Sequence, residues 1–536
     1  MRLSSLTTVV LCCTATLAAA PSVTGVFNAA SWIPPNLPNS GVAQGAIFTV
    51  TGTGLGPSTL QAATSYPLPS TAGLGGTTVQ VKVGGVTETC IMIYTVSTQV
   101  AALLPSATHT GAGTLTLSYQ GESSSFAIQV MAADFGTFAL NEGGSGPGVF
   151  TDTSYNVITM VNAAHPGETL VLWGSGLGPV TGPEDEPPSA GNLDVGEVQV
   201  LVGNQLVTPL YAGRSSSPGL DQINFVVPPG ITGCKTSVAV VVKGVTGNVT
   251  TLSVAPAGQT TCGDTFNALT TANLQKAVSS GSLNIAGVEL SHTVDGDVLA
   301  GDFTSFPLNS LIRSYGGTSA PSIGNCLSYE ILNSTLIFTD PIAASGTVSF
   351  LDVGSQLALT GPNGNKNINA TSTGVFATFL ATSSPYYLAP GDYTVANGSG
   401  GSNVAGFNWN LTLPASVVPD IPSSINRSQD LTLTWTGGSN FPVVSIVLYN
   451  GVKTTSTLKS YVYIICTAAG SAGTFTVPSA ILSLLPAEGF GNPTTPGVEI
   501  EISGVASNHF NVTGSPGLDE GFFSALISTG SVAAIQ

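Results

Sequence analysis

Three aspartates that lie close together form the one cluster in this sequence worth considering as a metal site. Asp295, Asp297 and Asp302 belong to the stretch DGDVLAGD. Carboxylate oxygens are ligands that Ca²⁺ prefers, so calcium binding is one hypothesis for this group. The spacing departs from the EF-hand loop, because the expected glycine and the distal glutamate are missing. A surface turn is the default interpretation, and a calcium site is the alternative.

The residue patterns that support other chemistry are missing. No serine has glycine both two residues before and two residues after it, as a hydrolase elbow requires. The four histidines are not at metal-ligand spacing from one another, and HExxH is absent. The turns GTGLG and GSGLG place their third glycine one residue too early for a dinucleotide-binding fingerprint. We therefore expect no catalytic residue, no cofactor and a non-enzymatic chain.

Exposed aromatic side chains are a second kind of candidate site, because their flat faces suit sugar rings. Tyr386 and Tyr387 follow Pro385 and are the aromatic pair most expected at the surface. Trp409 and Trp435 occupy positions that fit the core-facing side of a strand better. Structural use of these rings is the default, and sugar binding at the tyrosine pair is the alternative.

Charge limits the classes of partner. Charged residues make up 7% of the chain, against an average of roughly 25% in soluble domains. The net charge is −17, and the 11 Lys and Arg residues are scattered without a basic cluster. Nucleic acid and anionic membrane surfaces are therefore poor partners. A protein or a polysaccharide at the cell surface is the partner we expect, and the sequence does not indicate an oligomeric state.

The N-terminus has the pattern of an export signal. Residues 1–20 combine Arg2, an apolar stretch and the small-residue exit Ala18-Ala19-Ala20, which is typical of a secretory signal peptide. No later stretch approaches the length of an apolar membrane span. We therefore expect a secreted protein, extracellular or at the cell surface, with no transmembrane segment after signal cleavage.

Export permits disulfide bonds among the five cysteines that follow the signal. Cys234 and Cys262 bracket one apolar strand and its exit, and they are the best candidate pair. Cys326 and Cys466 are a weaker candidate pair. Cys90 lies in the apolar run CIMIY, which favours a buried free thiol over a nucleophile.

Two copies of one β-rich unit organise the first half of the chain. Gly45 and Gly52 have the same spacing as Gly167 and Gly174, and each later glycine begins or precedes a GLGP turn. Residues alternate between apolar and Thr or Ser at Leu115, Leu117 and their neighbours, which indicates a half-buried antiparallel strand. Short strands separated by turn residues at intervals of about 8–12 predict an immunoglobulin-type β-sandwich for each copy.

The repeated motifs carry a family resemblance. The combination of NAASW at Asn28–Trp32, GTGLGP or GSGLGP, VGG or VGN, and QINFVVP at Gln222–Pro228 resembles the IPT/TIG-like immunoglobulin repeats of secreted acidobacterial proteins. The resemblance covers residues 22–256, although the first copy has QVAA where the second has QINF. It implies fold and export, and it supplies no catalytic residues.

The whole chain is predicted to be all-β, with tandem immunoglobulin-like β-sandwiches and one short linking helix. A helix is expected within 257–283, because Leu269, Leu274 and Ala277 have helical spacing, with Asp264 or Thr265 as the cap and Gly281 as the end. In chain order, the expected units are a signal peptide 1–20, a first repeat 21–131, a second repeat 132–256, a helical linker 257–283, a β-sandwich module 284–414 and a C-terminal β-sandwich module 415–536.

These features favour a secreted, non-catalytic protein that acts in adhesion or scaffolding at the cell surface. A carbohydrate-binding accessory protein is the first alternative. A hydrolase with its site within 284–536 is the second alternative.

Overall fold

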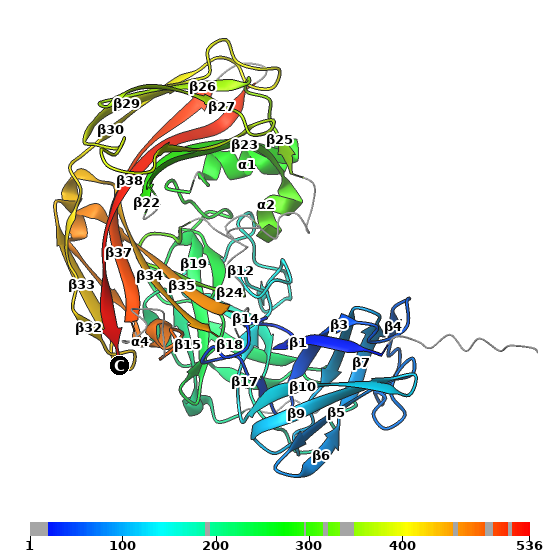
Figure 1. Ribbon diagram of the computed structural model, residues 1–536. Helices are drawn as coiled ribbons and strands as arrows, with labels where there is room; N and C mark the ends of the chain where they lie inside the picture. Colours follow the sequence, from blue (N-terminus) through cyan, green and yellow to red (C-terminus); the bar gives the residue numbers. More distant parts are fainter. Residues whose placement is uncertain are drawn as a thin grey trace, which may run out of the picture.

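A computed structural model of the chain describes residues 20–187, 193–267, 269–293, 296–314, 320–332, 348–453, 459–487, 497–512 and 517–536. The expected signal peptide, apart from Ala20, lies outside these residues. Figure 1 shows the first repeat at one end of the molecule, the second repeat in the middle, and the C-terminal half curving away as a large strongly bent sheet. The architecture is all-β with tandem immunoglobulin-like sandwiches, as the sequence predicts.

The first repeat consists of two five-stranded sheets packed face to face. The alternation predicted for Leu115 and Leu117 is confirmed, because both side chains are fully buried between the sheets. The first sheet has the order β1 (Ser22–Asn28), β3 (Ile47–Thr53), β8 (Gln99–Leu103), β7 (Ile91–Val96) and β4 (Gln61–Ala62). The second has the order β2 (Val42–Ala43), β10 (Glu122–Met131), β9 (Gly111–Tyr119), β5 (Thr77–Val83) and β6 (Val86–Thr89).

The second repeat reproduces this topology, which confirms the duplication seen in the sequence. In both copies a short strand pairs in parallel with the last long strand, β2 with β10 and β12 with β21. One sheet has the order β11 (Gly136–Thr137), β14 (Thr169–Ser175), β18 (Asp221–Val226) and β17 (Tyr211–Arg214), and β13 (Phe150–Thr151) pairs with β14. The other has the order β12 (Gly146–Pro147), β21 (Thr250–Val254), β19 (Gly233–Val242), β15 (Val198–Val202) and β16 (Gln205–Val207), and β20 (Val245–Thr246) pairs with β19.

The linking helix is present as α1 (Thr271–Ser280). Its apolar face buries Leu274 and Ala277, and it ends at Gly281, whose φ of 82° suits glycine. The predicted cap is wrong: Thr270 is the N-cap, and its hydroxyl accepts a hydrogen bond from the Asn273 amide. A second helix, α2 (Leu308–Ser314), and the short α4 (Ser479–Leu482) also occur in the described residues.

The C-terminal half is built on one ten-stranded sheet that the sequence did not predict. Its main path is β24 (Cys326–Leu332), β35 (Lys459–Ala469), β34 (Val443–Lys453), β37 (Gly497–Val512), β38 (Leu518–Ile535), β22 (Ser282–Thr293), β23 (Gly296–Pro307) and β25 (Ser349–Phe350). Two further strands join it, β28 (Val375–Ala381) on β23 and β32 (Ser424–Ile425) on β38. Two smaller sheets accompany it. One is a four-stranded sheet with the order β27 (Gly364–Asn369), β26 (Gln356–Gly361), β29 (Gly391–Ala396) and β30 (Asn408–Leu413). The other is a three-stranded sheet with the order β31 (Val418–Asp420), β33 (Leu431–Thr436) and β36 (Thr474–Val477).

The expected boundary between 414 and 415 therefore does not separate two sandwiches. Strand β22, from the first expected module, pairs in parallel with β38, the last strand of the chain, along eight registered positions from Ile285 to His292. A single apolar core runs across both expected modules and includes Trp409 and Trp435, which are buried as predicted. Parallel pairing joins segments that are distant in sequence, and no local pattern announces it.

Both predicted disulfide bonds are present. Cys234 at the start of β19 is bonded to Cys262, and Cys326 of β24 is bonded to Cys466, its registered partner on β35. Cys90 is a buried free cysteine, as expected, and burial raises the pKa of its thiol.

Candidate functional site

Asp297 and Asp302, the two aspartates of this group that the structure describes, do not come together as a metal site. Asp297 and Asp302 lie in strand β23 rather than in a surface turn, so the default interpretation of this stretch is wrong. Five residues apart in a strand, they point to opposite faces and their Cα atoms are separated by roughly 17 Å. Asp295 lies outside the described residues. Within the part of the chain that is described, no group of three His, Cys, Asp or Glu side chains could hold a metal ion.

Asp297 instead has a structural role. Its carboxylate is fully buried and accepts hydrogen bonds from the Leu388 amide at 2.6 Å and from the His292 ring, whose Nδ1 lies 2.6 Å away. The ring of Tyr386 packs edge-on against His292 at 4.5 Å. Asp297 thus fastens the loop before β29 to strand β23 of the large sheet, between β22 and β28.

The expected exposed tyrosine pair is also wrong. Tyr386 is 40% exposed, whereas Tyr387 is only 3% exposed and packs in the main core. The Tyr387 hydroxyl donates a hydrogen bond to the Gly364 carbonyl, and burial raises its pKa to about 12. The two residues lie in the loop between β28 and β29, where one ring packs inward and the other stays partly exposed, so the pair does not form one surface.

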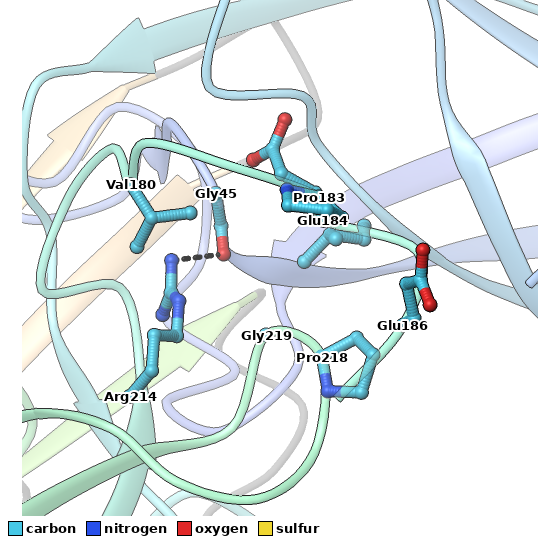
Figure 2. Close-up of a pocket in the computed structure, with 9 residues that line it drawn as sticks. Gly45, Val180, Pro183, Glu184, Glu186, Arg214, Pro218 and Gly219 are labelled. Atoms are coloured by element: carbon cyan, nitrogen blue, oxygen red, sulfur yellow. Dashed lines mark hydrogen bonds between the residues drawn. The ribbon is translucent and has the colours of Figure 1, made fainter. Parts of the chain in front are cut away.

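The most developed polar site in the described residues lies between the two repeats, where Arg214 is buried (Figure 2). Arg214 is the last residue of β17, and its side chain is 6% exposed. Its guanidinium donates to the Gly45 carbonyl of the first repeat at 2.7 Å and to the Gly178 carbonyl of the second at 3.0 Å. One side chain therefore ties the GLGP turn of the second repeat to the first.

Asp221 neutralises this buried cation. Its carboxylate forms an ion pair with the Arg214 guanidinium. It also accepts hydrogen bonds from the backbone amides of Gly176 and Leu177, at 2.7 and 2.8 Å. Burial raises the pKa of Asp221, against the lowering effects of the Arg214 charge and of the two amides. Asp221 is the first residue of β18 and pairs with Gly174 of β14, so the sheet itself fixes its position.

A second carboxylate crosses the joint in the same place. Glu184 lies in the loop after the second GLGP turn. Its two carboxylate oxygens lie 2.9 and 3.0 Å from the backbone nitrogen of Ser106 in the first repeat, which donates a hydrogen bond to them. The Ser106 hydroxyl donates a second hydrogen bond to the same carboxylate. The same hydroxyl accepts the Val180 amide at 2.9 Å. The next residue of the loop, Asp185, accepts the Leu68 amide through its carbonyl at 2.7 Å. Figure 2 shows Pro183 and Glu184 beside Gly45, with Arg214 on the other side and below.

The motif NAAS has a role at this joint that the sequence does not reveal. The Asn28 side chain donates to the carbonyls of Asp134 and Ser175 in the second repeat, at 2.9 and 3.2 Å. Its oxygen accepts the Ala30 amide at 2.9 Å and so shapes the following turn. The Ser175 hydroxyl accepts the Ile47 amide from the first repeat at 2.9 Å and donates to the Gly219 carbonyl at 2.7 Å.

The joint also excludes bulky side chains. Gly219 has a φ of 71°, and a Cβ atom at this position would lie 2.5 Å from Leu103 and 2.6 Å from Ile47, both in the first repeat. The remaining cavity has room for about one water molecule. A space of this size cannot admit a sugar, a nucleotide or a peptide side chain, so the chemistry of the site is the fixing of two repeats to each other.

A further brace runs from the first repeat to the C-terminal half. Ile33 and Leu37, which follow β1, belong to the buried cluster that joins the core of the C-terminal half to Leu201, Ala239 and Val249 of the second repeat. The Asn39 side chain donates to the Thr246 carbonyl of the second repeat at 3.1 Å. The Pro35 carbonyl accepts the Ser460 hydroxyl of β35 at 3.1 Å. The segment after β1 therefore connects all three parts of the molecule.

Comparison with known proteins adds little beyond this geometry. No family model and no curated protein matches the chain. Among solved structures, the chain is similar to the Plexin A4 extracellular region (15% identity, 42% of this chain and 17% of that one, TM-score 0.16). It is also similar to Sidekick-1 immunoglobulin domains 1–4 (9% identity, 96% and 99%, TM-score 0.13) and to domains 5–6 of the S-layer protein SbsC (14% identity, 44% and 99%, TM-score 0.15). At these scores the similarities carry no argument about function.

No helix in the described residues is both long enough and apolar enough to cross a membrane.

Proposed function

We propose that this chain is an exported, non-catalytic scaffold or adhesion protein that acts at the cell surface or in the extracellular matrix. The observation that carries the proposal is the joint between the repeats. Its charged groups, Arg214, Asp221 and Glu184, are engaged with one another or with backbone groups across the interface.

Such a joint suits a protein that must hold a shape. Flexible linkers between domains are the usual arrangement, and relative motion is the default unless the interface is extensive. Here the repeats share buried hydrogen bonds, and the segment with Ile33 and Leu37 extends the contact into the C-terminal half. The order of the parts is thereby fixed along the molecule.

The side chains first considered for catalysis or binding have structural partners. Asp297 is buried against His292 and Leu388, and Tyr387 is buried in the main core. The His509 ring contacts Glu520 with its Nδ1 atom at 2.9 Å, and His165 contacts the Gln259 carbonyl at 2.7 Å. These assignments support a non-enzymatic role, and export rests on the sequence pattern of residues 1–20.

The test combines location with binding. The full chain is expressed in a bacterial host that exports proteins, and the culture is separated into cytoplasm, surface-bound material and medium. We expect a chain that lacks residues 1–20 in the surface or medium fraction. An uncleaved chain confined to the cytoplasm would contradict the proposal.

The mature chain, residues 21–536, is then screened against cell-surface proteins, glycan arrays and insoluble polysaccharides, with and without calcium. Saturable, calcium-independent retention on a surface polymer without its breakdown supports a scaffold. Release of soluble sugars or peptides from a purified polymer would instead support a hydrolase. A Tyr386→Ala variant serves as the matched control for binding through the exposed ring, and we expect its retention to equal that of the wild type.

A further inference from the structure

A buried lysine, an asparagine and an aspartate meet where the second repeat joins the linker. Lys235 lies on β19 and is 1% exposed, Asn267 is 7% exposed, and Asp264 is 7% exposed. The Lys235 amine lies 3.3 Å from the side-chain oxygen of Asn267. A buried lysine ammonium is costly, so this arrangement requires an explanation.

The chain is arranged so that this lysine points inward. The pairing of β19 with β21 shifts register between Gly233 and Thr236, and Gly233 adopts a φ of 142°. A bulge of this kind re-aims the side chains within it. The neighbouring Cys234 is bonded to Cys262, which holds the segment after residue 262 against the start of β19.

The aspartate is placed against the amide of the asparagine. The Asn267 side-chain nitrogen donates to Asp264 at 3.0 Å, and the Asn267 backbone amide donates to the same carboxylate at 3.3 Å. The Ser322 hydroxyl also donates to Asp264, at 2.8 Å. Asp264 and Leu269 exchange backbone hydrogen bonds at 2.9 Å, so the turn that carries Asn267 is closed on both sides.

We propose that Lys235 and Asn267 become joined by an intramolecular amide bond, with Asp264 as the proton carrier. The three groups that such a bond requires are a buried amine, a carboxamide within reach and an acid that contacts the leaving nitrogen. The observed contact joins the Lys235 amine to the Asn267 side-chain oxygen, which is one bond from the carbon that the amine would attack. Groups held next to each other in this way gain a large advantage over the same groups in solution.

The chemistry balances without any oxidant or cofactor. The Lys235 ammonium passes one proton to the Asp264 carboxylate, and burial favours the neutral amine that results. The amine nitrogen attacks the side-chain carbonyl carbon of Asn267, and a C–N bond forms. One proton from the attacking nitrogen and the proton held by Asp264 move to the side-chain nitrogen of Asn267, the original C–N bond breaks, and the nitrogen leaves as ammonium. The new amide nitrogen keeps one hydrogen, and Asp264 returns to its carboxylate form.

The bond would link the second repeat to the segment that leads into α1 and the C-terminal half. It would act beside the Cys234–Cys262 disulfide and, unlike that disulfide, would persist under reducing conditions. The proposal goes beyond scaffolding and does not depend on it, because the chemistry involves only groups of the chain itself.

The test is the intact mass of the mature protein after complete reduction of its disulfides. We expect a mass lower than the sequence mass by one ammonia, and fragmentation should identify a branched peptide that joins Lys235 to Asn267. A folded protein with the full sequence mass, in which both residues are recovered in linear peptides, would overturn the proposal.

Matched variants exclude other sources of the mass loss. Lys235→Met and Asp264→Asn should each restore the full mass, whereas Lys243→Met, at an exposed position directly after the end of β19, should retain the loss. Succinimide formation at an Asn-Gly pair also releases ammonia, but it would persist in Lys235→Met, and that result would contradict the proposal. If Lys235→Met does not fold, two results still test the proposal. They are the presence or absence of the branched peptide in the wild-type protein and the intact mass of the Asp264→Asn variant.

Discussion

Replacement of Arg214 by methionine removes the central cation of the joint between the repeats. The variant retains most of the side-chain volume, so its main effect is the loss of the charge and of the donors. Asp221 is then left buried without its cationic partner, and the carbonyls of Gly45 and Gly178 each lose a donor.

The expected cost can be worked out from these contacts. Breaking a buried ion pair by removing one partner costs about 3–5 kcal/mol, because the remaining charge is not compensated. The amides of Gly176 and Leu177 still donate to Asp221 and limit the penalty, so we expect the lower half of this range. The double variant Arg214→Met/Asp221→Asn removes the orphaned charge and should recover at least about 1 kcal/mol, since groups in contact couple by about 0.5–3 kcal/mol.

The assay is denaturant unfolding of the mature protein, followed by tryptophan fluorescence. Trp173 precedes Gly174, which pairs with Asp221, so it reports on this part of the second repeat. Lys243→Met is the control, because Lys243 and Glu197 form an exposed ion pair worth less than about 1 kcal/mol. If Arg214→Met destabilises the protein no more than Lys243→Met, the reasoning about the joint is refuted.

Three further predictions concern buried positions. Asp134 is 2% exposed, and burial raises its pKa well above the usual value. The free energy of unfolding of the wild type should therefore fall as pH rises from the usual pKa of a carboxyl through the raised pKa. Unfolding experiments on Asp134→Asn should show that this pH dependence is lost and that the variant is more stable by about 1–3 kcal/mol at neutral pH. An unchanged slope would show that Asp134 does not titrate in this way. Gly219→Val should cost about 1–3 kcal/mol through contact with Leu103 and Ile47, and a melting temperature equal to that of the wild type would argue against close packing there. Cys90 should resist a thiol reagent until the protein unfolds, and rapid labelling of the native protein would contradict its burial.

The duplicated repeats and the compact linking helix could be predicted from the sequence because their signals are local. Alternation at Leu115 and Leu117 follows from the two-residue period of a strand, and the spacing of Leu274 and Ala277 follows from the helical turn. The Cys234–Cys262 pair was predicted from two cysteines that bracket one short apolar region, although that region contains three strands, β19 to β21, rather than one.

The remaining features depend on contacts between distant segments. The pairing of β22 with β38 leaves no local pattern, so the continuous C-terminal sheet appeared in the sequence as two modules. The stretch of Asp297 and Asp302 resembles a turn in composition, yet the pairing of β22 with β23 makes it a strand. The scarcity of Arg and Lys was a sequence signal that could have pointed to the joint and to the Lys235 cluster, because Arg214 and Lys235 are almost fully buried in so weakly charged a chain.

The most direct test of the scaffold account is small-angle X-ray scattering from the mature wild-type protein in solution. A rigid joint predicts that a single arrangement of the two repeats and the C-terminal half fits the scattering curve, and that Arg214→Met requires a broader set of arrangements. A wild-type curve that can be fitted only when the first repeat moves freely against the second would contradict the account.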